Sequence, residues 1–315
     1  MPAPTLLVLD ADPLPRLGRL TGRATIVHTG ADSLAARLPE ADVLLVWDTA
    51  TEALRDTWAG EGARPSWVHV AGVPVDRVLG PALTSSDTVV TNARGVFEDA
   101  VAEYVVALVL AMAKGLPEAW EAQRARQWRP REVLRVGGTR AVVVGAGPVG
   151  RTVARALKAA GVGVALVGRA PRTGIHGPGD LDRLLARAEW VVAAAPLTEA
   201  TRGMFDARRF GVMLPSARFV NVARGELVDE AALAEALRRR WIAGAALDVF
   251  AREPLGRDSP LWDVPDLLVT PRASGAFVGQ HDRLAAQFVE LWERREAGRR
   301  LVNVVDKARG YVPGH

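Results

Sequence analysis

Three glycines in the middle of the chain have the spacing of a dinucleotide-binding turn. An apolar run ends in Gly145, and Gly147 and Gly150 complete a Gly-x-Gly-x-x-Gly pattern directly before a helical stretch. In such a unit the first glycine makes the tight turn, the second lets the backbone approach a pyrophosphate, and the third lets the helix pack on the strand. N–H groups at the helix start then attract the phosphates. We expect a dinucleotide site that includes Pro148 and Val149; a tight turn without a ligand is the alternative.

The end of the next apolar run indicates which dinucleotide is bound. The run Val162–Val167 leads into Gly168, and Arg169 and Arg172 follow. NAD sites usually place Asp or Glu at this point to bind the ribose 2′-hydroxyl, and an acid there would repel a 2′-phosphate. Arginine attracts that phosphate through charge-assisted hydrogen bonds. We therefore expect NADP(H) to be preferred, with NAD(H) possible; two solvated surface arginines are the other interpretation.

The composition excludes several classes of site. The chain has 315 residues, which is enough for two hydrophobic cores, and its 49% hydrophobic and 24% charged residues are ordinary globular values. It has no cysteine, which excludes disulfides, thiolate zinc sites and a cysteine nucleophile. Its five histidines lack metal-ligand spacing, so we expect no metal.

The charge and the apolar stretches indicate a small molecule as the ligand. The formal net charge is only +4, and no basic run with interleaved aromatics suggests nucleic-acid binding. The longest apolar stretch, Val105–Ala113, is too short to cross a bilayer, and the N-terminus lacks the basic and apolar regions of a signal peptide. We expect a cytoplasmic protein with a small-molecule substrate and neither a nucleic-acid nor a membrane partner.

Short apolar runs alternate with helical patterns along almost the whole chain, which is typical of parallel sheets covered by helices. In the first part the expected strands are Leu6–Leu9, Thr25–His28, Val43–Val46, Trp67–Val70 and Val89–Val90. In the second part they begin at Ala141 and continue at Val162–Val167, Trp190–Ala194, Arg218–Asn221, Gly244–Leu247 and Leu267–Val269. The pattern predicts an α/β fold with doubly wound parallel sheets in two Rossmann-like or flavodoxin-like lobes.

A long helix and the segment after it suggest self-association. The helix expected over Val96–Lys114 is apolar around much of its surface, and Pro117 would end or kink it. The segment that follows carries Trp120 and Trp128 among charged residues. Because aromatic and arginine enrichment suits an interface, we expect a homodimer. A fully intramolecular helix with a packed arm is the alternative.

Several segments, in the same order and over nearly the whole chain, resemble the D-isomer-specific 2-hydroxyacid dehydrogenases, especially the glyoxylate/hydroxypyruvate reductase branch. They are Val96–Tyr104, the glycine turn, Ala195–Phe205, Phe219–Val228, Ala246–Pro254 and Thr270–Gly275. The resemblance implies a cofactor domain at residues 93–275, with a dimerisation helix and arm at about 96–136. That domain would be inserted in a substrate domain formed by residues 1–92 and 276–315.

The resemblance also implies an activity and the residues that carry it. The family reduces 2-oxo acids with NAD(P)H: hydride goes to C2 and a protonated histidine gives a proton to the oxygen. Matched motif by motif, Arg224 binds the substrate, Glu253 holds the histidine, Asp248 contacts the nicotinamide amide, and Pro196 and Ala223 join the cofactor site. Arg224 follows an apolar strand, so it would stand at the carboxyl end of the sheet, and its planar fork suits a carboxylate. A surface arginine in a loop is the alternative.

The catalytic histidine itself is absent. The family motif Thr-Pro-His-x-Ser/Ala-Gly here has Arg272 at the histidine position. Arginine has a pKa above about 12, so it cannot be a general acid whose pKa lies near the operating pH. It can still stabilise a developing oxyanion electrostatically. Glu253 would then pair with a permanent cation, and we expect an atypical site formed by Arg224, Glu253 and Arg272.

A second departure affects the loop after the fourth strand, where family members clamp the substrate carboxylate with backbone N–H groups. We expect Ala71, Gly72 and Val73 to bind substrate, but Pro74 stands where the family has glycine. Proline has no N–H, so one donor is lost unless the loop shifts to use Gly72 or Val73. A third departure is Ala276, where a close branch often has Asp.

Three functions fit these residues. The leading hypothesis is an NADPH-dependent carbonyl reductase in which Arg224 and Arg272 form an electrophilic clamp, with water or His69 as the proton source. The second is a cofactor-binding protein with little turnover, acting as a sensor or partner. The third is a reductase of a non-carboxylate or imine substrate. His281 is a weaker candidate acid, and both histidines are more typical of structural positions.

Overall fold

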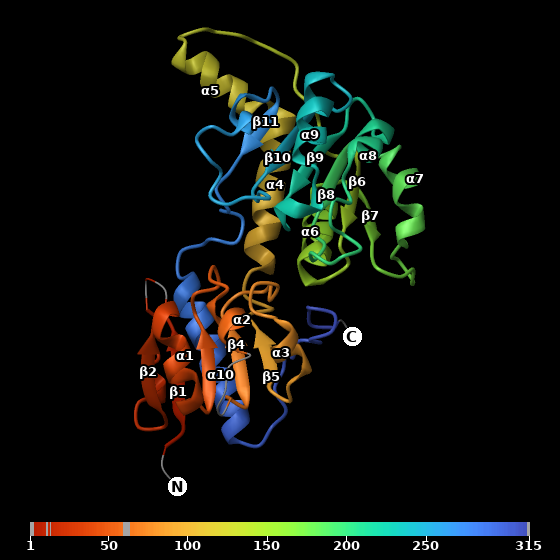
Figure 1. The fold of residues 1–315 in the computed structure, drawn as a ribbon. Coiled ribbons are helices and arrows are strands. Elements are labelled where there is room, and N and C mark those ends of the chain that lie inside the picture. Colours follow the sequence, from red (N-terminus) through yellow and green to blue (C-terminus); the bar gives the residue numbers. More distant parts are fainter. Residues whose placement is uncertain (1–2, 11, 13, 59–63, 314–315) are drawn as a thin grey trace. The chain divides into compact units, whose positions relative to one another are not determined.

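The chain folds into two compact units, each built around one parallel sheet (Figure 1). The computed structural model describes residues 3–10, 12, 14–58 and 64–313. The first unit combines residues 1–97 with 277–315, and the second consists of residues 98–276. The second unit is therefore an insertion in the chain of the first, and the expected α/β fold with two parallel sheets is confirmed.

The first unit has a five-stranded sheet in the order β2-β1-β3-β4-β5. Its strands are β1 (Thr5–Leu9), β2 (Thr25–Thr29), β3 (Val43–Val46), β4 (Trp67–Val70) and β5 (Val89–Asn92). Its helices are α1 (Leu34–Arg37), α2 (Ala53–Thr57), α3 (Pro81–Ser85) and α10 (Gln280–Glu296). Leu34, Leu54 and Leu83 pack on one face of the sheet, whereas Phe288 and Trp292 of α10 pack on the other. Because both faces are covered, the strands read as continuous apolar runs.

The second unit has a six-stranded sheet in the order β11-β10-β9-β8-β6-β7. Its strands are β6 (Arg140–Val144), β7 (Gly163–Val167), β8 (Trp190–Ala193), β9 (Arg218–Asn221), β10 (Gly244–Leu247) and β11 (Leu267–Val269). Its helices are α4 (Glu98–Lys114), α5 (Leu116–Arg124), α6 (Pro148–Ala159), α7 (Leu181–Leu185), α8 (Ala207–Val212) and α9 (Glu230–Arg238). Every strand expected from the apolar runs is present.

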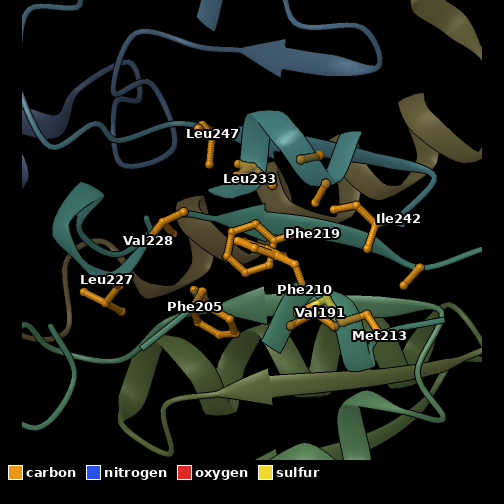
Figure 2. Close-up of a cluster of buried hydrophobic side chains, with 14 of the residues drawn as sticks. Val191, Phe205, Phe210, Met213, Phe219, Leu227, Val228, Leu233, Ile242 and Leu247 are labelled. Atoms are coloured by element: carbon orange, nitrogen blue, oxygen red, sulfur yellow. The ribbon is translucent and has the colours of Figure 1, made fainter. Parts of the chain in front are cut away.

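Three phenylalanines contact one another within the hydrophobic core of the second unit (Figure 2). The ring of Phe219 on β9 lies 4.7 Å from that of Phe205 and 5.5 Å from that of Phe210, measured between centroids. The Phe210 ring meets Phe219 edge-on at 89°, which is a favoured aromatic geometry. Phe210 belongs to α8, so this cluster fixes that helix on the sheet that carries the site.

The order of strands in the second unit favours a ligand site at the end of β6. This strand has β7 on one side and β8 on the other, so the chain reverses its direction of winding there. In open α/β sheets, ligands bind outside the carboxyl ends of the strands at such a point. The glycine turn follows β6 directly, and all the other functional residues expected in this unit follow the carboxyl ends of its strands.

The long helix ends at Lys114, as expected, but Pro117 is not the residue that ends it. Helix α4 stops at Lys114, Gly115 takes a φ of +58°, and α5 continues at an angle of 61°. Pro117 lies in the first turn of α5, where proline is well tolerated, so the glycine makes the break. Within the described residues no single helix is long and apolar enough to span a membrane; α4 and α5 would reach that length only together, as a bent pair.

Candidate cofactor and active site

The three fingerprint glycines have three different surroundings. Gly145 has a φ of +125°, and a Cβ atom placed on it would lie 2.3 Å from the carbonyl oxygen of Ala194. A Cβ on Gly150 would lie 1.8 Å from the carbonyl oxygen of Gly145. A Cβ on Gly147 would meet nothing within 4 Å, so the space above this residue is open. Gly145 and Gly150 are therefore required by the fold, whereas Gly147 leaves room for a ligand.

The start of α6 fits the phosphates of a dinucleotide. Gly147 is the N-cap residue, no side chain caps the helix, and Pro148 and Val149 form its first turn. The N–H groups at such a helix start, together with the helix dipole, favour an anion. The guanidinium of Arg151 donates to the carbonyl oxygen of Ala146 over 2.9 Å and so fixes the turn. An open space, an uncapped helix start and a fixed turn are what a pyrophosphate needs.

Strand β8 contributes the neighbouring edge of this site. The backbone of Ala194 lies so close to Gly145 that a side chain on Gly145 would collide with it. Pro196 follows two residues later, is exposed, and its carbonyl oxygen accepts a hydrogen bond from the Thr201 hydroxyl over 2.7 Å. Pro196 therefore lies in a loop that follows the strand next to the glycine turn.

The segment after β7 carries the two arginines expected to bind a 2′-phosphate. The N–H of Arg172 donates to the carbonyl of Ile175 over 3.0 Å, and the return bond measures 2.8 Å, so the segment closes into a tight turn. A Cβ on Gly168 would lie 2.9 Å from Ile175 Cγ2 and 3.0 Å from Ala146 Cβ, so an acid there would be crowded. Arg169 and Arg172 are exposed, and neither side chain is hydrogen-bonded or paired with any residue in the described part of the chain.

Arg224 is held at the end of β9 by a residue that the sequence analysis did not single out. Asn221, the last residue of the strand, is fully buried. Its side chain donates to the carbonyl of Arg224 over 2.8 Å and accepts from the N–H of Ala223 over 3.1 Å. Arg224 is half-buried, and its guanidinium donates to the carbonyl of Ala223 over 3.0 Å. A buried polar residue at the end of an apolar strand was the available signal for Asn221.

A second glycine contact brings the Arg224 segment against the loop that contains Glu253. A Cβ on Gly225 would lie 1.8 Å from the carbonyl carbon of Phe250, so the two backbones touch. The N–H of Phe250 donates to one carboxylate oxygen of Glu253 over 3.1 Å. Arg224 and Glu253 therefore belong to one cluster of segments at the carboxyl edge of the sheet.

Arg272 joins this cluster through Glu253. Its guanidinium donates to the second carboxylate oxygen of Glu253 over 2.5 Å, with side chains 51% and 20% exposed respectively. The N–H of Arg272 donates to the carbonyl of Asp248 over 2.9 Å. Arg272 has a φ of +54°, in the left-handed region that few residues other than glycine adopt. The structure thus brings Arg272 to the glutamate, as the sequence motifs suggested.

Asp248 lies at the end of β10 and is fully buried. One of its carboxylate oxygens accepts from the Thr270 hydroxyl over 2.6 Å and from the N–H of Ala273 over 2.8 Å. The other accepts from the N–H of Ser274 over 2.9 Å. Both oxygens are therefore engaged by the segment around Arg272, and the expected contact with the nicotinamide stays a prediction.

The loop after β4 in the first unit consists of Ala71, Gly72, Val73 and Pro74. The carbonyl of Gly72 accepts from the N–H of Ala93 over 3.0 Å, and that of Val73 accepts from the Asn92 side chain over 2.6 Å. No residue in the described ranges accepts a hydrogen bond from the N–H of Gly72 or of Val73. Two successive backbone donors thus remain in the loop although Pro74 supplies none.

His69 was wrongly considered as a proton source. It lies within β4, is completely buried, and its ring packs against Phe288 at 5.4 Å between centroids. Its Nδ1 lies 2.8 Å from the Thr91 hydroxyl. Burial lowers the pKa of His69 to about 3, so the imidazole is neutral and shielded from any substrate. His281 is exposed at the start of α10, beside Trp47 at 5.9 Å between centroids.

In the described residues no three histidine, cysteine or acidic side chains gather into a group that could hold a metal ion. At the carboxyl edge of the second sheet, Arg272 pairs with Glu253, and the segment that carries Arg224 lies against the loop that contains Glu253. This arrangement can bind and stabilise negative charge on a small molecule.

Comparisons with known proteins agree with this architecture. The sequence model of the D-isomer specific 2-hydroxyacid dehydrogenase NAD binding domain matches residues 106–274. The chain is 34% identical over 289 residues to D-3-phosphoglycerate dehydrogenase from Mycobacterium bovis, a match that covers 89% of this chain and 54% of that protein. The chain thus spans about half the length of the curated relatives it matches.

Solved structures match over nearly the full chain. A D-isomer specific 2-hydroxyacid dehydrogenase from Xanthobacter autotrophicus, in complex with NADPH and MES, is 31% identical with a TM-score of 0.82, and the match covers 98% of this chain and 100% of that one. An NADPH-dependent glyoxylate/hydroxypyruvate reductase from Sinorhizobium meliloti, in complex with NADP and sulfate, is 27% identical with a TM-score of 0.83 and the same coverage.

Proposed function

Because the chain belongs to the D-isomer specific 2-hydroxyacid dehydrogenase family, we propose that it is an NADP(H)-dependent reductase of a 2-oxo acid or a related carbonyl compound. The observation that carries this proposal is that Arg272 pairs with Glu253 beside the segment that carries Arg224. These residues follow strands of the same sheet as the complete glycine turn. A bound nicotinamide cofactor supplies the hydride. The residues of this chain bind the two molecules and stabilise the negative charge that develops on the carbonyl oxygen.

The preference for NADP(H) rests on the segment after β7. Arg169 and Arg172 offer two guanidinium groups, and the acid that would bind a ribose hydroxyl would be crowded at Gly168. Hydrogen bonds to charged groups contribute about 1.5–3 kcal/mol, which corresponds to roughly 10- to 150-fold in affinity. Two solved relatives are complexes with NADPH or NADP, which supports the same preference.

Measured dissociation constants for NADPH and NADH test the cofactor. We expect NADPH to bind more tightly, and the Arg169→Ala, Arg172→Ala double variant to remove most of the difference without weakening NADH. Arg238→Ala, an exposed arginine at the end of α9, is the matched control and should change neither constant. NADH binding equal to or tighter than NADPH binding in the wild-type protein would contradict the assignment.

In the proposed reaction Arg224 binds the substrate carboxylate, because its planar guanidinium matches two carboxylate oxygens. Arg272, oriented by Glu253, stabilises the charge that develops on the carbonyl oxygen. Since a guanidinium does not release its proton at neutral pH, the proton of the product alcohol comes from water. The Gly72 and Val73 N–H groups are the donors that we assign to substrate binding in the first unit.

A screen of NADPH oxidation against glyoxylate, hydroxypyruvate and longer 2-oxo acids tests this reaction. We expect turnover of at least one of them, and Arg224→Gln to lower kcat/KM by roughly 10- to 150-fold, as for the loss of a charged hydrogen bond. A folded, NADPH-binding protein that reduces no carbonyl compound would instead favour a cofactor-binding role with little turnover. Turnover of imines alone would favour the third hypothesis.

We also propose that the chain forms a homodimer through α5 and the segment that follows it. Trp120 is 58% exposed and Trp128 is 94% exposed, and the end of the segment returns to α4 through the Leu134 N–H and the Ala113 carbonyl, 2.9 Å apart (Figure 1). Tryptophans that are exposed to this extent in a single chain are typical of residues that anchor a protein interface.

Light scattering at micromolar concentration tests the dimer. We expect twice the monomer mass for the wild-type protein, and a shift towards monomer when Trp120 and Trp128 are both replaced by serine. Trp262, which is 52% exposed and lies outside α5 and the segment that follows it, provides the control: Trp262→Ser should leave the mass unchanged. A wild-type monomer at this concentration would refute the proposal.

A further inference from the structure

We infer that Asp248 is a positioning residue, whose buried carboxylate holds the segment 270–274 in the one conformation that presents Arg272 to Glu253. This deepens the proposed function and rests on it for the activity readout. The structural readouts described below do not depend on any activity. The role differs from the cofactor contact that the family motif implies for this aspartate.

Both carboxylate oxygens of Asp248 are engaged by hydrogen bonds within the chain. The carboxylate accepts three hydrogen bonds, from the Thr270 hydroxyl and from the N–H groups of Ala273 and Ser274, at 2.6–2.9 Å. Asp248 is fully buried. A buried carboxylate is stable only when such donors satisfy it, and here all of them come from the two sides of Arg272.

The backbone of Arg272 has an unfavourable conformation. Its φ of +54° is unfavourable for a residue with a side chain, so the surroundings must impose it. The N–H of Arg272 donates to the main-chain carbonyl of Asp248 over 2.9 Å, and the next two N–H groups donate to the Asp248 carboxylate. One aspartate thus binds three successive N–H groups and fixes the turn at Arg272.

Asp248 is itself anchored to Asn221, the residue that holds Arg224. The N–H of Asp248 donates to the carbonyl of Asn221 over 3.0 Å. The Asn221 side chain in turn donates to the carbonyl of Arg224 over 2.8 Å. A continuous set of hydrogen bonds therefore joins the two arginines of the site, and Asp248 lies in its centre.

The variant Asp248→Asn keeps the size of the side chain and replaces one acceptor oxygen with a donor. We expect native-state amide exchange at Ala273 and Ser274 to become at least tenfold faster, because the carboxylate that accepts from them is weakened. Exchange at Arg272 should also become faster, because its N–H belongs to the same turn. The Kd of NADPH should stay within twofold of the wild-type value. The kcat for the best 2-oxo acid should fall by about tenfold or more with little change in KM, since only the placement of Arg272 is disturbed.

A double-mutant cycle separates positioning from a direct contact with the cofactor. If Asp248 acts through Arg272, then Asp248→Asn should cost little further activity in the Arg272→Ala background. Asp206 caps α8 by accepting from the N–H of Arg209 over 2.9 Å, away from the site. Asp206→Ala is therefore the matched control: it removes a structural carboxylate of the same unit, and its effect on kcat should be small.

Three outcomes bear on the positioning role of Asp248. Unchanged amide exchange at 272–274, or a weakening of NADPH binding as large as the fall in kcat, would overturn the positioning role. If the wild-type protein reduces no carbonyl compound, the proposed function fails, and amide exchange still decides the role of Asp248. If Asp248→Asn does not fold, Thr270→Val removes one of the three donors, and it should produce the same pattern with smaller changes.

Discussion

Arg272 donates a hydrogen bond to Glu253 over 2.5 Å, so the glutamate that holds a histidine in the family motif here holds a permanent cation. The pair lies at the surface, where an ion pair contributes at most about 1 kcal/mol to stability. Its main effect is therefore orientation. The guanidinium has five N–H donors and Glu253 occupies one of its nitrogens, so Arg272 keeps donors for a developing oxyanion.

We predict that Arg272→His does not restore an ordinary general acid. The change should reduce the native activity and give little on simple 2-oxo acids, even though Glu253 is present to orient the imidazole. A general acid contributes about 10²–10⁴-fold, so a restored one would be obvious in steady-state rates. The double change with Pro74→Gly, which also returns a backbone donor to the substrate loop, is the sharper form of the test. A steep rise in hydroxypyruvate reduction by Arg272→His alone would show that Arg272 is merely a lost histidine.

The glycine turn offers a pair of variants that separates folding from cofactor binding. Gly147→Ala places a methyl group in open space, so the melting temperature should hardly change, while NADPH binding should weaken by tenfold or more. Gly150→Ala places the methyl group 1.8 Å from the carbonyl oxygen of Gly145, so the protein should lose several degrees of thermal stability as well. Thermal melts and NADPH titrations of both variants check this. Equal NADPH affinity of Gly147→Ala and the wild-type protein would place the pyrophosphate elsewhere.

His69 should make the first unit sensitive to acid. Burial holds its pKa near 3 in the folded protein, against about 6.5 in the unfolded chain, so below pH 6.5 the unfolded state binds a proton that the folded state does not. The free energy of unfolding therefore suffers no loss from His69 above pH 6.5. As the pH drops from 6.5 towards 3, this group lowers the free energy of unfolding by up to about 1.4 kcal/mol per pH unit.

Denaturant unfolding between pH 4.5 and 7.5 measures the His69 contribution. The slope of the unfolding free energy against pH should become shallower in His69→Phe, a variant that keeps an aromatic ring beside Phe288. His281→Gln, at an exposed histidine, is the control and should keep the wild-type slope. Identical slopes for the wild-type protein and His69→Phe would mean that His69 gains a proton in the folded state.

Much of the fold could be predicted because strands of a parallel sheet are buried on both faces and read as apolar runs. The same property hid the role of His69. In a strand that is buried on both faces, nearness to the strand end does not show whether a side chain reaches the ligand edge. The break before α5 was assigned to Pro117 because a proline inside a helical pattern normally ends it, whereas Gly115 makes the turn and the proline starts the next helix.

Sequence motifs predicted the charged residues of the site, but they did not predict the hydrogen bonds that hold those residues in place. Glu253 and Arg272 meet as their motifs suggested, whereas the tight turn between Arg172 and Ile175 was not predicted. A polar residue at the end of an apolar strand indicates that it binds something, but its type and spacing do not show which backbone groups Asn221 and the carboxylate of Asp248 bind. The left-handed conformation of Arg272 belongs to the same class of feature.

The pH dependence of kcat tests most directly whether Arg272 has replaced the general acid. The measurement is NADPH-dependent reduction of the best 2-oxo acid from the screen, between pH 6 and 9, for the wild-type protein, Arg272→His and Arg272→Ala. Because arginine stays protonated throughout this range, we predict a wild-type kcat that does not change with pH. Arg272→His should be slower and should lose rate as the pH rises through the imidazole pKa, near about 6.5. A wild-type kcat that follows a single ionisation, unchanged in size and position in Arg272→Ala, would show that another group donates the proton and that Arg272 carries no chemistry.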